Sequence, residues 1–242
     1  MALHERKRII PGSRRLRILA LLPSHPKPEP STSRLCEVAA EITSMTGTGI
    51  MLMSGRMARG SLCSSDRVSS KIEDLQFTLG EGPCVEAYNE AWPVTEPDLA
   101  DPDLARWPAF TPLALEARAR AVFGFPMETG RVRLGALNLS RDQPGPLTPE
   151  QHADSLVMAD VAARAVVAMQ ASAPDGALPA ELESLASLQA VVHQASGMVS
   201  AQLGVSVNES LVRLRVFAFS HDSSLYDVAK EVVGRRLRFD EL

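Results

Sequence analysis

Cys84 has the clearest chemical potential in this sequence, because it follows the turn at 80–83 where a short helix is expected to begin. A helix N-terminus lowers the pKa of a thiol and favours the thiolate, which would suit redox sensing. A small buried packing residue is the alternative interpretation, since free cysteines are among the most buried residues. Cys36 and Cys63 lie apart, without C-x-x-C spacing, so the sequence supports neither a disulfide framework nor a zinc knuckle.

Basic side chains gather in two places near the end of the chain, and these could contact phosphate groups. They are Arg213, Arg215, Lys230, Arg235, Arg236 and Arg238. Basic residues near helix ends are usually solvated or paired with the helix dipole, so charge alone does not predict a nucleic-acid partner. His193 and His221 have no metal-ligand spacing, and we expect no metal and no cofactor.

Composition excludes several classes of protein. The chain has 242 residues, of which 45% are hydrophobic and 22% charged, which is enough for packed cores. No run of about 18 apolar residues predicts a membrane span, so we expect no membrane partner and a cytoplasmic location. Aromatic residues make up only 5%, which argues against a stacking surface for single strands. The net charge of −4 also argues against a simple polybasic nucleic-acid binder.

The elements that must position these residues begin after a tail. Residues 1–30 combine basic residues with a proline tract and predict a disordered arm. Residues 31–172 predict an α+β domain with an antiparallel sheet, closed by a helix that starts at a Thr148–Gln151 capping box. Two strands at 121–128 and 132–140 form its clearest hairpin. Residues 173–181 have the composition of a linker.

Residues 182–242 predict an all-α module of three helices. A seam of apolar residues at three- and four-residue steps marks the first helix: Leu182, Leu185, Leu188, Val192, Ala195, Val199 and Leu203. Gly204 ends this helix, and Ser206 and Ser224 cap the next two. A module of this size is small for an independent core, so the seam could also form a homodimer.

This module resembles the ANTAR family of RNA-binding antiterminator domains. The resemblance is carried by "HQASGMVSAQLGVS" (193–206), "ESLVRLRVFAFS" (209–220) and "SLYDVAKEVVGRRLRF" (224–239). It implies binding of RNA stem-loops by the basic residues, of which we select Arg213, Arg215, Lys230, Arg235 and Arg236. The family motif implies tight helix packing at its small residues, which are Ala195, Gly197, Ala218 and Ala229. Ser196 stands where many members have lysine, and Ser210 where many have alanine.

The stretch 31–172 resembles a GAF sensor domain of the kind joined to ANTAR tails in actinobacterial regulators. The carrying residues are "FTLGEGPCVEA" (77–87), "EPDLADPDLARWPAF" (96–110), "FGFPMETGRVRLGALNLSR" (123–141) and "LTPEQHADSLVMADVAA" (147–163). The resemblance implies a pocket for a small-molecule or redox signal, with Trp92, Trp107, Phe110 and Phe125 as candidate lining residues. Core packing explains these aromatic residues equally well.

The two resemblances together imply a non-enzymatic, signal-responsive transcription antiterminator. One alternative is a thiol enzyme that reduces free methionine sulfoxide, which would require a nucleophilic and a resolving cysteine close together. The other is a helix-turn-helix regulator that binds DNA, whose recognition helix should begin with base-contacting side chains. Residues Ser223, Ser224 and Asp227 match that requirement poorly.

Overall fold

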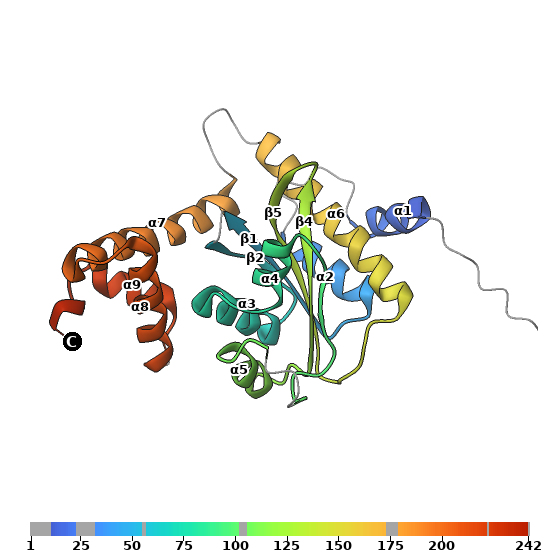
Figure 1. The fold of residues 1–242 in the computed structure, drawn as a ribbon. Coiled ribbons are helices and arrows are strands. Elements are labelled where there is room, and N and C mark those ends of the chain that lie inside the picture. Colours follow the sequence, from blue (N-terminus) through green and yellow to red (C-terminus); the bar gives the residue numbers. More distant parts are fainter. Residues whose placement is uncertain are drawn as a thin grey trace, which may run out of the picture.

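The chain folds into a five-stranded antiparallel sheet with helices on both faces and a helical bundle at one side (Figure 1). The computed structural model describes residues 11–22, 32–54, 57–101, 106–172, 179–221 and 223–241. The strands are β1 (Gly47–Ser54), β2 (Met57–Ser64), β3 (Val94–Glu96), β4 (Ala121–Thr129) and β5 (Val132–Arg141), in the order β2-β1-β5-β4-β3. The N-terminal and sheet-covering helices are α1 (Pro11–Leu21), α2 (Thr32–Thr43), α3 (Arg67–Leu79), α4 (Pro83–Glu90), α5 (Phe110–Glu116) and α6 (Pro149–Ser172).

The alternation of side chains along the strands builds a separate core on each face of the sheet. Ile50 and Leu52 of β1 pack in the core under α2 and α6, whereas Met51 and Met53 pack in the core under α3, α4 and α5. This is the period of two that a sheet covered on both faces requires. The predicted α+β antiparallel domain is therefore confirmed.

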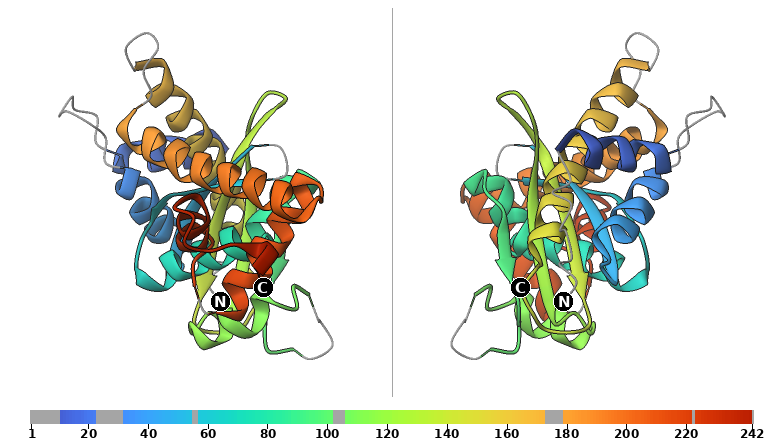
Figure 2. Two further views of the ribbon diagram at one scale, coloured as in Figure 1. Left: turned by 90° about the vertical axis from the view of Figure 1, so that its left-hand side faces the viewer. Right: turned by 90° about the vertical axis from the view of Figure 1, so that its right-hand side faces the viewer.

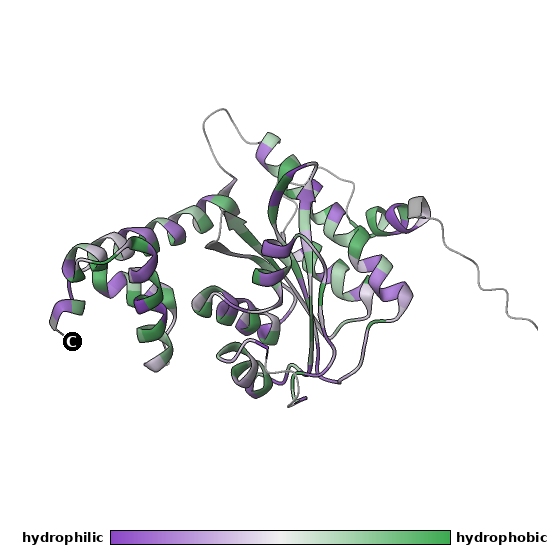
Figure 3. Cartoon of the chain, in the orientation of Figure 1, coloured by the Kyte–Doolittle hydropathy of each residue, from purple (hydrophilic) through white to green (hydrophobic). Residues whose placement is uncertain are grey.

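Helix α6 begins where its capping box predicts. The Gln151 backbone N–H donates to Thr148 Oγ1 at 3.1 Å, and the Gln151 side chain accepts from the Thr148 N–H at 3.0 Å. Among the described residues α6 is the one helix long and apolar enough to cross a bilayer. Its apolar residues alternate with polar ones (Figure 3), and Met158, Ala162 and Val166 lie buried in the core.

The prediction of a disordered arm at 1–30 is wrong for Pro11–Leu21, which form α1. Ile18 is buried in the core beneath α6, and Arg14 and Arg17 pair with the buried Asp154 at 2.6 and 2.7 Å. The local composition is polar and gives no sign of these partners, which lie more than a hundred residues away. The remaining predicted tail lies mostly outside the described residues.

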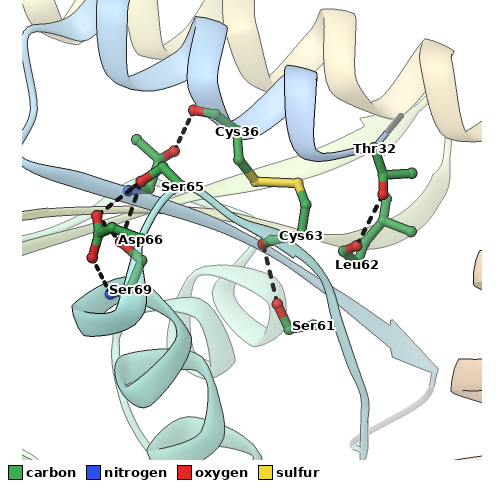
Figure 4. Close-up of a disulfide and its surroundings, with 9 residues drawn as sticks. Thr32, Cys36, Ser61, Leu62, Cys63, Ser65, Asp66 and Ser69 are labelled. Atoms are coloured by element: carbon green, nitrogen blue, oxygen red, sulfur yellow. Dashed lines mark hydrogen bonds between the residues drawn. A yellow bond between two sulfur atoms is a disulfide. The ribbon is translucent and has the colours of Figure 1, made fainter. Parts of the chain in front are cut away.

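A disulfide joins α2 to the edge strand β2, contrary to expectation (Figure 4). Cys36 and Cys63 are separated by 27 residues in sequence and by 6.1 Å between their Cα atoms. Thr32 Oγ1 donates to the Leu62 carbonyl at 3.3 Å and joins the same two elements. Spacing along the chain cannot reveal this pair, because α2 lies across β2 only in the folded domain.

The C-terminal module consists of α7 (Ala180–Leu203), α8 (Val207–Ser220) and α9 (Leu225–Val233), followed by a short 3-10 turn. Gly204 ends α7 in the left-handed conformation, with φ of 65°. Ser206 and Ser224 accept hydrogen bonds from the backbone N–H groups of Glu209 and Asp227, as predicted for N-caps. Residues 173–178 of the predicted linker lie outside the described structure.

Helix α7 is shared between the sheet domain and the bundle (Figures 1 and 2). Leu182 and Leu185 are buried in the core beneath α2 and β2, where Leu185 lies against Gly60. Val192 and Val199 lie further along the helix, in the separate core formed with α8 and α9. The apolar seam is therefore largely covered within one chain, and the homodimer that it was expected to form stays a prediction.

Candidate functional site

The segment containing Cys84 is held by α3. The Gln76 side-chain oxygen accepts a hydrogen bond from the Cys84 backbone N–H at 2.7 Å, which satisfies a donor at the start of α4. Gly82, with φ of 128°, leaves room for Gln76, since a Cβ there would lie 2.7 Å from its side chain. The predicted helix start at Pro83 is confirmed.

Cys84 itself does not have the environment of a reactive thiolate. Its side chain is completely buried, and burial raises the pKa of the thiol well above its ordinary value, with the nearby Glu73 carboxyl adding to the rise. Desolvation outweighs the helix N-terminus on which the sequence-based expectation rested. Cys36 and Cys63 are bonded to each other in the core on the opposite face of the sheet, so Cys84 has no resolving partner nearby.

A buried polar cluster, formed by Glu73, Gln76 and Asn138, occupies the same face of the sheet as Cys84. Asn138 lies on β5, in register with Gly49 on β1 and Gly124 on β4. A Cβ on Gly49 would lie 2.6 Å from a Glu73 carboxylate oxygen, so glycine is what lets this side chain lie against the sheet.

Several polar atoms of this cluster are buried without a hydrogen-bond partner among the described residues. They are both carboxyl oxygens of Glu73, both side-chain amide atoms of Asn138 and the Gln76 amide nitrogen. Burying such groups unpaired costs free energy, so the cluster is the strongest candidate in the sheet domain for a site that accepts a polar ligand.

Burial raises the pKa of Glu73 from 4.5 to about 8. At neutral pH the carboxyl is therefore mainly protonated and can both donate and accept hydrogen bonds. Sequence reasoning missed Glu73 and Asn138, because polar residues in a polar helix or on a strand are expected to face solvent. The glycine inside the strand at position 49 was the one available signal.

Two glutamates near Cys84 hold the segment that precedes α5 through hydrogen bonds and an ion pair. Glu81 accepts from the backbone N–H groups of Ala109 and Phe110 at 2.7 and 2.8 Å. Glu86 accepts from the Trp107 indole N–H at 2.9 Å and forms an ion pair with Arg106. The motif "GEGPCVEA" thus organises a neighbouring loop through its two carboxylates.

The aromatic residues proposed as pocket lining occupy different environments. Trp107 and Phe110 pack edge to face at 5.8 Å in the core beneath α3, α4 and α5, and Phe125 is buried on the opposite face of the sheet. Trp92 is 73% exposed. Trp92 is therefore wrong as a lining residue, because it precedes β3 at the surface rather than lying within that strand.

Two of the predicted RNA-binding arginines, Arg213 and Arg236, pair with carboxylates in the described structure. Arg213 pairs with Glu209 one helical turn earlier at 2.8 Å. Arg236 pairs with Glu231 through two hydrogen bonds of 2.7 and 2.8 Å, which lower the pKa of that carboxyl. These pairs are exposed, so RNA phosphate groups could compete for the arginines at little cost.

Arg215 does not lie on the exposed surface with the others. It is half-buried where α8 meets α3, and burial lowers the pKa of its guanidinium. Lys230 and Arg235 are exposed, and no carboxylate pairs with them among the described residues. The structure thus brings Lys230, Arg235 and Arg236 together at the C-terminal end of α9 and leaves Arg213 and Arg215 on α8.

The small residues of the family motif also lie in two different environments, since three of them are buried and one is exposed. Ala195, Ala218 and Ala229 are fully buried in the core of the bundle, as tight helix packing requires. Gly197 faces open space, and a Cβ there would meet nothing within 4 Å, so its predicted packing role is wrong. It lies on the outer face of α7. In the described part of the chain no group of acidic, histidine and cysteine side chains could hold a metal ion.

Solved GAF domains resemble the sheet domain. The GAF domain of an Acinetobacter phosphoenolpyruvate-protein phosphotransferase aligns with a TM-score of 0.50 and 14% identity, over 66% of this chain and 95% of that one. The corresponding domain from Coxiella burnetii aligns with a TM-score of 0.48 and 12% identity, over 66% and 95%. The alignment with the Acinetobacter domain shows that the sheet domain has a GAF-type fold.

The remaining comparisons with known proteins give only weak similarity or no match. A type II free methionine-R-sulfoxide reductase from Thermoplasma acidophilum aligns with a TM-score of only 0.38 and 18% identity, over 53% of this chain and 84% of that one. That likeness is too weak to support an enzymatic interpretation. No protein-family model matches the sequence, and no curated protein matches it.

Proposed function

We propose that this protein is a signal-responsive regulator whose GAF domain controls RNA stem-loop binding by the C-terminal helices. The observation that carries the proposal is the three-helix bundle with its own apolar core, joined to the GAF domain through the shared helix α7. Its basic residues gather at the end of α9, where Lys230 and Arg235 face solvent. Paired RNA is bound mainly through its shape and its phosphate groups, which suits so compact a basic surface.

The start of α9 supports RNA rather than DNA as the partner. A helix-turn-helix protein reads bases with side chains at the start of its recognition helix. Here the Ser224 hydroxyl accepts from the Asp227 backbone N–H at 3.0 Å and donates to the Asp227 carboxylate at 2.7 Å. Both side chains are occupied in capping the helix, so they are poorly placed to read base edges.

The buried polar cluster is where we place the signal. A small polar molecule could satisfy the unpaired atoms of Glu73, Gln76 and Asn138 and so gain binding energy that the free protein lacks. The protonated thiol of Cys84 supports a non-enzymatic role for this face.

RNA as a target implies that the protein acts in the cytoplasm. A disulfide such as Cys36–Cys63 is uncommon in that compartment.

Crosslinking the protein to RNA in living cells, followed by sequencing of the bound RNA, tests this function. We expect recovery of paired stem-loops upstream of transcription terminators, and loss of that enrichment in a Lys230→Ala/Arg235→Ala variant. Recovery of DNA fragments alone, or of RNA without stem-loops, would overturn the proposal.

A homodimer remains a prediction. Because α7 is covered within the chain, a second copy would need another surface, and the exposed apolar residues Val212, Val216 and Phe219 on α8 offer one. Mass measured across protein concentration, with and without RNA, checks this. A protein that stays monomeric while it binds RNA fully would contradict it.

A further inference from the structure

The C-terminal end of α3 connects the GAF domain to the helical bundle. Phe77 contacts both the core under the sheet and the core of the bundle. One residue further on, the Thr78 hydroxyl accepts from the Leu225 backbone N–H at 3.4 Å, at the start of α9. Figures 1 and 2 show the bundle lying beside α3, on the side away from α2 and α6.

Arg215 reaches across this junction to the end of α3. Gly80 ends that helix with φ of 70°, and a Cβ on Gly80 would overlap the Arg215 guanidinium. The guanidinium thus lies at the negative end of the α3 dipole. Its Nε atom is buried without a hydrogen-bond partner in the described part of the chain. The contact therefore combines a favourable dipole interaction with the uncompensated cost of desolvating the Arg215 guanidinium.

The packing around this contact is incomplete. A cavity of about 440 Å³ lies between α3, α5 and α8, and its walls include Asp74, Leu113 and Phe219. An interface with such a void gains less from burial than a filled core does. The bundle is therefore held on the GAF domain by a small set of contacts, which a modest change in free energy could release.

The same helix also carries the buried polar cluster. Glu73 and Gln76 lie on α3 within two turns of Gly80, and their side chains face the sheet. A ligand that pairs with them would reposition α3 relative to the sheet, and the α3 C-terminus would move with it. The polar side chains of Glu73 and Gln76 and the contact between Gly80 and Arg215 therefore lie on a single rigid helix.

We propose that Arg215 is a latch: docked against Gly80, it holds the bundle on the GAF domain and is withheld from RNA until α3 moves. This inference rests on the proposed RNA-binding function and specifies how it is regulated. The docked structure is the low-affinity state, and a signal at the buried polar cluster shifts the population toward an undocked state. Arg215 then becomes accessible to RNA on α8.

The test is a Gly80→Asn variant of the full chain. Asparagine tolerates the left-handed conformation, so the new side chain would fill the space of the Arg215 guanidinium and force it out. Gly204→Asn is the matched control, because Gly204 also ends a helix with φ of 65° but has open space around its missing Cβ. Thr78→Val is a second undocking variant that adds almost no volume and removes the hydrogen bond to Leu225.

Two measurements are made on each variant: amide hydrogen exchange across 75–80 and 211–220, and affinity for a stem-loop RNA at fixed salt. We expect Gly80→Asn and Thr78→Val to exchange faster in both segments and to bind RNA at least about five-fold more tightly. Gly204→Asn should match the wild-type protein. Adding Arg215→Ala to Gly80→Asn should remove the gain in affinity.

Unchanged exchange and affinity in both undocking variants would overturn the latch. So would an affinity gain that survives Arg215→Ala, because Arg215 would then not be the group that is withheld. If exchange rises but neither the wild-type protein nor any variant binds RNA, the proposed function fails, and the latch as a control of RNA binding fails with it.

Discussion

The protonation of Glu73 depends strongly on the fold. Its carboxyl lies against Gly49 in a region without water-exposed surface, and its pKa rises to about 8. Asn138 and Gln76 contribute further unpaired polar atoms to the same place. A structure that keeps these groups buried loses stability at this position, which is common where a binding site must remain ready for a ligand.

Replacing Glu73 with glutamine should flatten the pH dependence of stability. The unfolded chain ionises this group near 4.5 and the folded protein near 8, so the folded state retains a proton between these values. The free energy of unfolding should therefore fall as pH rises through that window, by up to about 1.4 kcal/mol per pH unit. Denaturant unfolding from pH 5 to 8 measures this. Glu73→Gln should remove the fall in unfolding free energy with pH, and Glu37→Gln, at an exposed position, should leave it in place. Equal slopes of unfolding free energy against pH in the wild-type protein and both variants would contradict the raised pKa of Glu73.

The sequence predicted the helix start at Cys84 and left two interpretations of the thiol open, of which the structure supports the buried packing residue. The helix start was readable from Gly82 and Pro83, which are local signals. The burial that raises the thiol pKa comes from strands and helices distant in sequence. Glu73 and Asn138 were missed for the same reason, since only tertiary packing makes them buried.

The helices and strands fall into those specified locally and those fixed by distant partners. The capping residues Thr148, Ser206 and Ser224 act within four residues, and the helices that they start were predicted correctly. Helix α1 depends on Asp154, and the position of α2 depends on a bond to β2. Neither could be read from the sequence, because each requires the folded sheet.

Removing both arginines that pair with Asp154 should detach α1. Arg14→Ala/Arg17→Ala leaves a buried carboxylate without a partner, and the expected loss of stability is about 3 kcal/mol. Arg15→Ala is the control, because Arg15 pairs at 3.3 Å with the half-exposed Asp160 and should cost less than about 1 kcal/mol. Chemical denaturation compares the variants; equal, small losses would show that α1 contributes nothing through these ion pairs.

Reducing the disulfide should destabilise the sheet domain. The bond closes a loop of 27 residues, and a loop of that length corresponds to about 3 to 4 kcal/mol of unfolding free energy. Unfolding with and without reductant measures the difference, and a Cys36→Ala/Cys63→Ala variant should be insensitive to reductant. Cys84→Ala should retain the full response. A wild-type protein whose stability ignores reductant would contradict the prediction.

At the scale of the whole molecule, the core of the bundle is connected to both cores of the sheet domain, to one by α7 and to the other by the end of α3. Composition and helical periodicity predicted an α+β domain and a three-helix module, and the structure contains both sets of elements. The predicted break between them, at 173–181, lies mostly outside the described residues. The sequence did not predict that Leu182 and Leu185 belong to the core of the sheet domain or that Arg215 faces Gly80. These facts concern how the domains dock, which no local pattern encodes. In the proposed mechanism, these contacts link a signal in one domain to a surface on the other.

Titration of a labelled stem-loop RNA with the full chain, followed by fluorescence anisotropy at several salt concentrations, tests the central claim most directly. The wild-type protein should bind paired RNA more tightly than duplex DNA of equal length. Lys230→Ala/Arg235→Ala should bind about ten-fold more weakly, with a salt slope reduced by between about one and two. Arg67→Ala/Arg131→Ala, which removes two exposed charges from the sheet domain, should leave RNA affinity unchanged. Equal affinity for duplex DNA, or equal loss in both double variants, would contradict the account.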